Sequence, residues 1–121
     1  MNKANDVSEA IINQRYKEMA YKIIADACVE YTSVLNAMNR GRRALDIAHD
    51  LDRRMTIEQE LRRKDGKRLS LEKFFKSSWF DVLSCGKVTG DEIIVTMRKR
   101  AGFSPEDIPY NARVTLAGGG E

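Results

Sequence analysis

The sequence has few of the residues from which metal, redox and covalent chemistry are built. It holds one histidine, His49, and two cysteines, Cys28 and Cys85, which lie far apart and form no CxxC pair. A zinc site needs about four ligands at suitable spacing, so the cysteines and the histidine cannot form one. We therefore expect no metal and no cofactor. We also expect both thiols to be reduced, with Cys28 as a small core residue.

Long apolar runs are missing as well. The uninterrupted apolar stretches reach only a few residues, as in 93–95, whereas a membrane-spanning helix needs about 20. The segment 1–9 is polar and lacks the apolar centre of a signal peptide. These absences predict a cytoplasmic protein with no membrane partner.

The usual catalytic motifs do not occur. There is no GxxxxGK[ST] phosphate loop and no GxSxG nucleophile turn. Asp46, His49 and Asp50 have the spacing of one helix face, and such a group can serve as a general base or a metal site. A solvated helix surface with local ion pairs explains the same residues. We expect that the protein is not an enzyme.

Helical periodicity is what the sequence does contain. Apolar residues recur every three or four positions from Ile12 to Met38. This pattern predicts a helix of about 30 residues that begins at Asp6 or Ser8 and ends at Gly41. A helix about 45 Å long needs either a second helix folded back along it or another chain.

Three more helices are expected after the first. The second begins near Ala44, kinks or restarts near Thr56, and ends at 64–67. The third runs from Ser70 to the pair Cys85-Gly86, and contains three of the four Phe residues and the single Trp.

The fourth helix begins at Thr89, which has capping-box spacing to Glu92, and ends at 101–102. A short turn follows at Ser104-Pro105, and 110–116 can add a short extended segment. The sequence therefore predicts an all-α fold: a long helical hairpin with a smaller C-terminal aromatic helical pair. It predicts one domain over 1–116 and a flexible, irregular tail over 117–121.

Positive charge is concentrated in the middle of the chain. The segment 40–68 has ten basic and six acidic residues, which leaves four of excess positive charge, while the whole chain has a net charge of +3. Arginine suits phosphate because its donors form a planar fork. The candidate nucleic-acid-binding residues are Arg42, Arg43, Arg62, Arg63, Lys67 and Arg68. The interleaved acids and the modest total charge are also typical of an ordinary solvated surface.

The aromatic run in the expected third helix is the most distinctive motif. Adjacent pairs such as Phe74-Phe75 and Trp79-Phe80 cannot both point the same way from a helix. One member of each pair can therefore lie on a second surface. Phe75, Trp79 and Phe80 are the candidate protein-binding residues, and the alternative is that these rings only fill a core.

The stretch 71–83, followed by 90–94 and Met97-Arg98, resembles small uncharacterised proteins of bacterial prophages and mobile elements. In those proteins an FFxSxWFxxL pattern precedes a short loop, a glycine and a helix that ends LIxxLR. The likeness covers about 30 residues. Here Ile94 and Met97 replace the expected leucine or isoleucine, and the loop 85–89 is longer. The resemblance implies a mobile-element setting and carries over no catalytic residue.

Three functions are compatible with these patterns. The leading hypothesis is a non-enzymatic accessory protein that binds another protein, either a different chain or a second copy. A homo-oligomer is possible because Tyr16, Tyr31 and the methionines of the first helix can form a seam between chains. The alternatives are a nucleic-acid-binding protein that uses the arginine clusters, and a small phage inhibitor that blocks a host defence enzyme.

Overall fold

The structure is a computed structural model that describes the backbone of residues 3–114 and the side chains of residues 9–114. These residues form four α-helices and two 3-10 turns, and none of them is in a strand. The helices are α1 (Lys3–Ile47), α2 (Leu51–Phe75), α3 (Ser78–Ser84) and α4 (Gly90–Ala101). The predicted all-α class is therefore confirmed, as is the hairpin of two long helices. The predicted tail, 117–121, lies outside the described residues.

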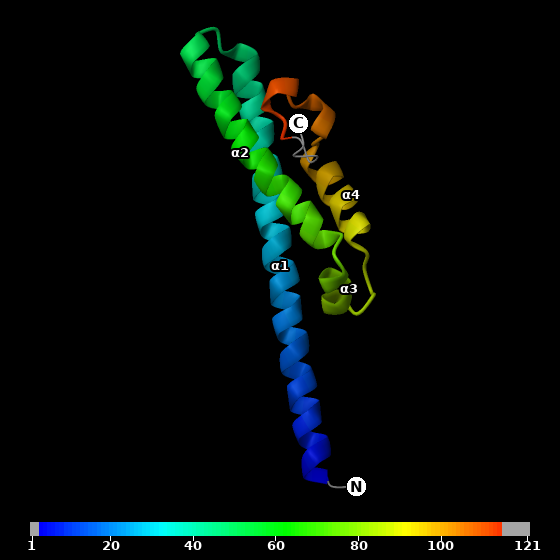
Figure 1. The fold of residues 1–121 in the computed structure, drawn as a ribbon. Coiled ribbons are helices and arrows are strands. Elements are labelled where there is room, and N and C mark those ends of the chain that lie inside the picture. Colours follow the sequence, from blue (N-terminus) through cyan, green and yellow to red (C-terminus); the bar gives the residue numbers. More distant parts are fainter. Residues whose placement is uncertain (1–2, 115–121) are drawn as a thin grey trace.

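The helix α1 runs the whole length of the molecule (Figure 1). At 1.5 Å per residue, its 45 residues span about 67 Å. The helix α2 folds back antiparallel along the C-terminal half of α1, and α3 and α4 lie beside the middle of α1. The N-terminal part of α1 extends beyond all the other elements.

The turn between α1 and α2 lies later in the chain than predicted. We expected the first helix to end at Gly41, but α1 continues to Ile47. Gly41 instead lets α2 approach α1 closely, because a Cβ atom there would lie 2.8 Å from Leu61 Cδ2. Arg54 closes α1 by donating from Nη1 to the carbonyl oxygens of Leu45 (2.8 Å) and Ala48 (2.9 Å).

The helix α2 is continuous where two interruptions were expected. Asp50 caps its N-terminus by accepting a hydrogen bond from the backbone N–H of Arg53 at 3.0 Å. The chain passes through Thr56, Gly66 and Ser70 without a break. Packing of α2 against α1 outweighs the modest helical cost of one glycine, about 1 kcal/mol. The real break comes after Phe75, so the single helix predicted over 70–85 is divided between the end of α2 and α3.

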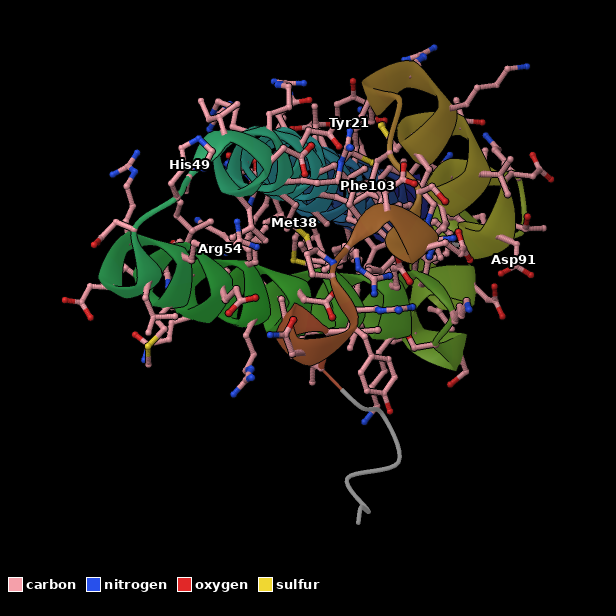
Figure 2. The ribbon with its side chains drawn as sticks, turned by 90° about the horizontal axis from the view of Figure 1, so that it is seen from above. Tyr21, Met38, His49, Arg54, Asp91 and Phe103 are labelled. Atoms are coloured by element: carbon pink, nitrogen blue, oxygen red, sulfur yellow. The ribbon has the colours of Figure 1, made fainter. Side chains whose placement is uncertain are left out.

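The core lies where α1, α2 and α4 meet. Tyr31, Phe75 and Phe80 are fully buried, and Phe75 packs edge-on against both Tyr31 and Phe80, with ring centroids 5.4 and 5.8 Å apart. In the view along α1, Met38 and Phe103 lie between the helices, whereas His49 lies at the outer turn (Figure 2). The aromatic centre predicted from the sequence is thus a core.

The C-terminal part of the described chain closes this core. Thr89 caps α4 by accepting from the backbone N–H of Glu92 at 3.1 Å, and α4 ends at Ala101-Gly102, both as predicted. Gly102 is in the left-handed conformation. The predicted turn at Ser104-Pro105 is present as the 3-10 turn Pro105–Asp107. A second 3-10 turn, Tyr110–Ala112, replaces the start of the expected extended segment, whose last two residues, 115–116, are not described.

Candidate protein-binding groove

An apolar groove of about 290 Å³ lies between the N-terminal half of α1 and the wall formed by α3 and the α3–α4 loop. One wall presents Tyr16, Ala20, Tyr21 and Ile24 from α1, together with Lys17. The other wall consists of Phe80, Leu83, Val88 and, in the first turn of α4, Ile93, together with Ser84, Cys85 and Lys87. Phe80 and Leu83 are themselves buried. Carboxylate side chains do not contribute to this lining.

Local structure fixes the second wall. Ser77 caps α3 by accepting a hydrogen bond at Oγ from the backbone N–H of Phe80 at 3.2 Å, and its hydroxyl donates to the carbonyl oxygen of Phe74 at 2.6 Å. Cys85 ends α3 with a φ of 54°, in the left-handed region. Gly90 then allows the start of α4 to lie against the end of α2, because a Cβ atom there would lie only 1.7 Å from the carbonyl oxygen of Phe75.

Large apolar side chains are exposed along both elements that border the groove. Tyr21 has 76% of its surface exposed, the highest value among the large apolar residues on this part of α1. Ile12 and Met19 are also exposed on α1, and so are Trp79 and Val82 on α3. Single exposed apolar residues are ordinary, but a gathering of them beside a groove is typical of a binding surface.

Two of the three predicted protein-binding residues are not available to a partner. Phe75 is 1% exposed and Phe80 is 0% exposed, because both rings lie in the core. The expectation that they anchor a partner is therefore wrong for this fold. Trp79, at 48% exposed, remains on the surface. Tyr31, which was expected to contribute to a seam between chains, is likewise in the core, whereas Tyr16 lines the groove.

The predicted nucleic-acid-binding residues do not form one free set. Arg68 is 5% exposed and bound to two carboxylates, so it cannot contact phosphate. Arg63 pairs with Glu60 at 2.5 Å, and Lys67 lies 4.0 Å from Glu30. Arg62 donates to the carbonyl oxygen of Asn111 at 2.6 Å.

The remaining two residues of the predicted nucleic-acid-binding group differ in exposure. Arg42 is half-buried, and its Nε atom is buried without a hydrogen-bond partner among the described atoms. Arg43 is exposed. Of the six predicted cations, only Arg43 is therefore exposed with no ion pair or hydrogen bond to another described side chain or carbonyl.

The group of Asp46, His49 and Asp50 is divided by the hairpin turn. Asp46 is in the last turn of α1, His49 lies in the connection, and Asp50 caps α2. They do not share a helix face, and all three are exposed. Within the described part of the chain, no three His, Cys, Asp or Glu side chains gather in a way that could hold a metal ion.

A buried ionic network that the sequence reading missed joins α1, α2 and α4. Glu72 on α2 accepts hydrogen bonds at Oε2 from Tyr31 Oη (2.6 Å), Arg98 Nη2 (2.7 Å) and Arg68 Nη1 (3.1 Å). Arg68 also donates from Nε to Asp65 at 2.7 Å, and Asp65 accepts from the backbone N–H of Val114 at 2.8 Å. The spacing of Asp65, Arg68 and Glu72 marks one helix face once the helix is read through Gly66.

The network keeps Glu72 ionised. Burial by itself would raise the pKa of Glu72, but the hydrogen bonds from Tyr31 and Arg98 and the nearby positive charges outweigh it, so this pKa lies below its ordinary value. Burial and the hydrogen bond to Glu72 raise the pKa of the Tyr31 hydroxyl. The two carboxylates balance the two guanidinium groups, so the network carries no excess charge, and removal of one partner would leave a buried charge without compensation.

Comparison with known proteins identifies no relative of this chain. Neither a protein-family model nor a curated protein nor a solved structure matches it. None of the helices in the described range is both long enough and apolar enough to cross a membrane. The site must therefore be interpreted from its own geometry.

Proposed function

We propose that this protein acts without catalysis, by binding another protein through the apolar groove between α1 and the α3–α4 wall. The observation that carries the proposal is the apolar lining of this groove, in which Tyr21 and Val88 are exposed and Tyr16, Ile24 and Ile93 are half-buried. A groove lined by aromatic and aliphatic side chains, with few polar groups, suits the apolar anchors of a protein partner.

The N-terminal half of α1 supports the same interpretation. Among residues 9–29 only Ala20 is buried, and Ile24, Ala27 and Cys28 are partly buried against the core, so this half adds less to the core than residues 31–47 do. A helix without tertiary packing is marginally stable in water. A partner in the groove would cover Tyr16, Tyr21 and Ile24 and supply the burial that this half of α1 lacks.

A cytoplasmic, mobile-element setting remains part of the proposal. It rests on the FFxSxWFxxL pattern of residues 74–83 and on the unpaired Cys28 and Cys85. Direct steric block of a host enzyme is one form that protein binding can take in such a setting. Nucleic-acid binding has weaker support, because most of its candidate cations are paired or buried.

Site-specific photo-crosslinking tests the proposal. A benzophenone amino acid at position 21, in the groove, is compared with the same group at position 110, where Tyr110 is also strongly exposed but on the 3-10 turn Tyr110–Ala112. We expect a discrete protein adduct from position 21 only, and its loss when Val88→Asp places a charge in the groove. Equal adducts from both positions, or none from position 21, would contradict the proposal.

A further inference from the structure

The groove carries charge of one sign. Its twelve lining residues include Lys17 on the α1 wall and Lys87 on the opposite wall, and no aspartate or glutamate. Neither lysine forms an ion pair with any residue in the described range. Lys22, which is also on α1 but outside the lining, differs from Lys17 because it pairs with Asp26 at 3.2 Å. Both walls of the groove therefore present an unneutralised ammonium group beside apolar side chains.

We propose that the groove binds an acidic amphipathic helix of a partner protein, a proposal that rests on the protein-binding function above. The apolar face of that helix would lie on Tyr16, Tyr21 and Ile24, and its carboxylates would lie beside Lys17 and Lys87. Helix-in-groove recognition commonly uses apolar anchors for affinity and flanking charges for partner choice.

The length of the groove fits such a helix. Its α1 wall extends from Tyr16 to Ile24, which is about 12 Å at 1.5 Å per residue. Two turns of a partner helix cover this distance and place two or three apolar side chains at i, i+3 or i+4, and i+7. The acidic residues of the partner then lie at the two edges of this stripe, one edge toward each lysine.

The charges at the groove also disfavour the other occupants. Two lysines supply few contacts for a nucleic-acid backbone, which is bound through many phosphates. A second copy of this chain would bring its own α1, whose Tyr16–Ile24 segment carries Lys17, Glu18 and Lys22 and therefore adds no excess of carboxylates to a groove that already presents two lysines. An acidic helix, by contrast, would bring carboxylates to both lysines of the groove.

Two matched peptides provide the probe. Each is a labelled amphipathic helix of about 18 residues with the same leucine stripe. The polar face is rich in glutamate in one peptide and rich in lysine in the other. Binding to the full chain is followed by fluorescence anisotropy at low and moderate salt, alongside sedimentation of the chain alone. We expect the acidic peptide to bind about tenfold more tightly than the basic one, because each exposed ion pair adds a modest increment.

Two double variants localise the effect. Lys17→Glu with Lys87→Glu reverses the charge in the groove. Lys22→Glu with Lys99→Glu makes the same change in net charge on exposed positions outside the lining. We expect the first variant to reverse the peptide preference and the second to keep it, with circular dichroism confirming that both remain folded.

The outcomes separate this proposal from the function on which it rests. Equal binding of both peptides, or equal effects of the two double variants, overturns the acidic partner but leaves an apolar protein-binding groove. Binding of neither peptide also overturns the acidic partner, and the crosslink from position 21 then decides whether the groove binds protein at all. Self-association of the chain that buries position 21 overturns it in favour of a second copy.

Discussion

The two halves of α1 belong to one unbroken helix but have opposite surroundings. In the C-terminal half, residues 31–47, Leu35 is 0% exposed and lies in the core with Tyr31 and Met38. In the N-terminal half, residues 9–29, Val29 is 71% exposed and the groove residue Tyr21 is more exposed still. Both halves carry apolar residues at helical spacing, so the difference comes from what lies opposite. The packed half provides stability, and the bare half leaves exposed the apolar surface that we propose a partner covers.

The largest effect is expected where α4 is held against the end of α2, beside the packed half. In Gly90→Ala the new Cβ atom would meet the backbone carbonyl of Phe75 at 1.7 Å, a contact that no side-chain rotation relieves. We expect a loss of about 3 kcal/mol or more in urea unfolding. Gly86→Ala is the control, because nothing lies within 4 Å of its Cβ position. The only expected cost of Gly86→Ala is the strain of an L-residue at a φ of 70°, about 1 kcal/mol. Equal losses would show that the close contact at Gly90 does not exist.

The comparison between the halves is tested directly by one truncation in each. Leu35→Ala removes a fully buried side chain and should lower the free energy of unfolding by about 3 kcal/mol. Val29→Ala removes an exposed one and should change it by less than about 0.5 kcal/mol. The measurement is chemical denaturation of both variants under the same conditions. A comparable loss in the two variants would mean that the N-terminal half is packed in solution.

The buried network should make the packed half sensitive to acid. Glu72→Gln removes the charge but keeps an acceptor, and should cost about 2 kcal/mol near neutral pH. Because the pKa of Glu72 is lowered in the folded state, its contribution is present above the unfolded pKa of about 4.3 and is lost as pH falls through the lower, folded pKa. The difference in unfolding free energy between Glu72→Gln and the unsubstituted protein should therefore shrink as the pH is lowered from 7. A constant gap down to the lowest pH would contradict this role.

A smaller effect is expected at the cap of α4. Thr89→Ala removes the acceptor for the backbone N–H of Glu92 and should lower stability by about 1 kcal/mol. Ser78→Ala, at an exposed position in the first turn of α3, is the control and should leave the melting temperature nearly unchanged. If both variants melt alike, Thr89 does not hold the start of α4 and hence does not fix the groove wall that precedes it.

The sequence predicted the elements of this fold better than their surroundings. Helical spacing identified α1 and α4, and the capping pair at Thr89 and Glu92 located the start of α4 correctly. Two glycines misled the prediction of the helix ends. Glycine commonly follows the last residue of a helix, but Gly41 and Gly66 lie inside α1 and α2. In the structure Gly41 instead makes room for Leu61, and that role depends on tertiary contact.

The candidate site was harder to predict for the same reason. Phe75, Trp79 and Phe80 are all large aromatic residues, yet only Trp79 is exposed. The break after Phe75 sets the direction of α3 so that Phe80 points into the core. Tyr16, Ala20 and Ile24 fall on the apolar stripe of α1, which continues into the core. Nothing in their spacing shows that this stretch of the stripe faces only the short α3, the α3–α4 loop and the start of α4, and so lines a groove instead of a closed interface.

Amide hydrogen exchange along α1 tests the central claim most directly. We expect amides of residues 31–47 to exchange slowly and those of residues 12–24 to exchange far faster, because helical hydrogen bonds with little tertiary cover open locally. We also expect the acidic peptide to slow exchange in residues 16–24 and to leave residues 31–47 unchanged. Equal protection of the two halves in the free protein would contradict the account, because the N-terminal half would then already be covered.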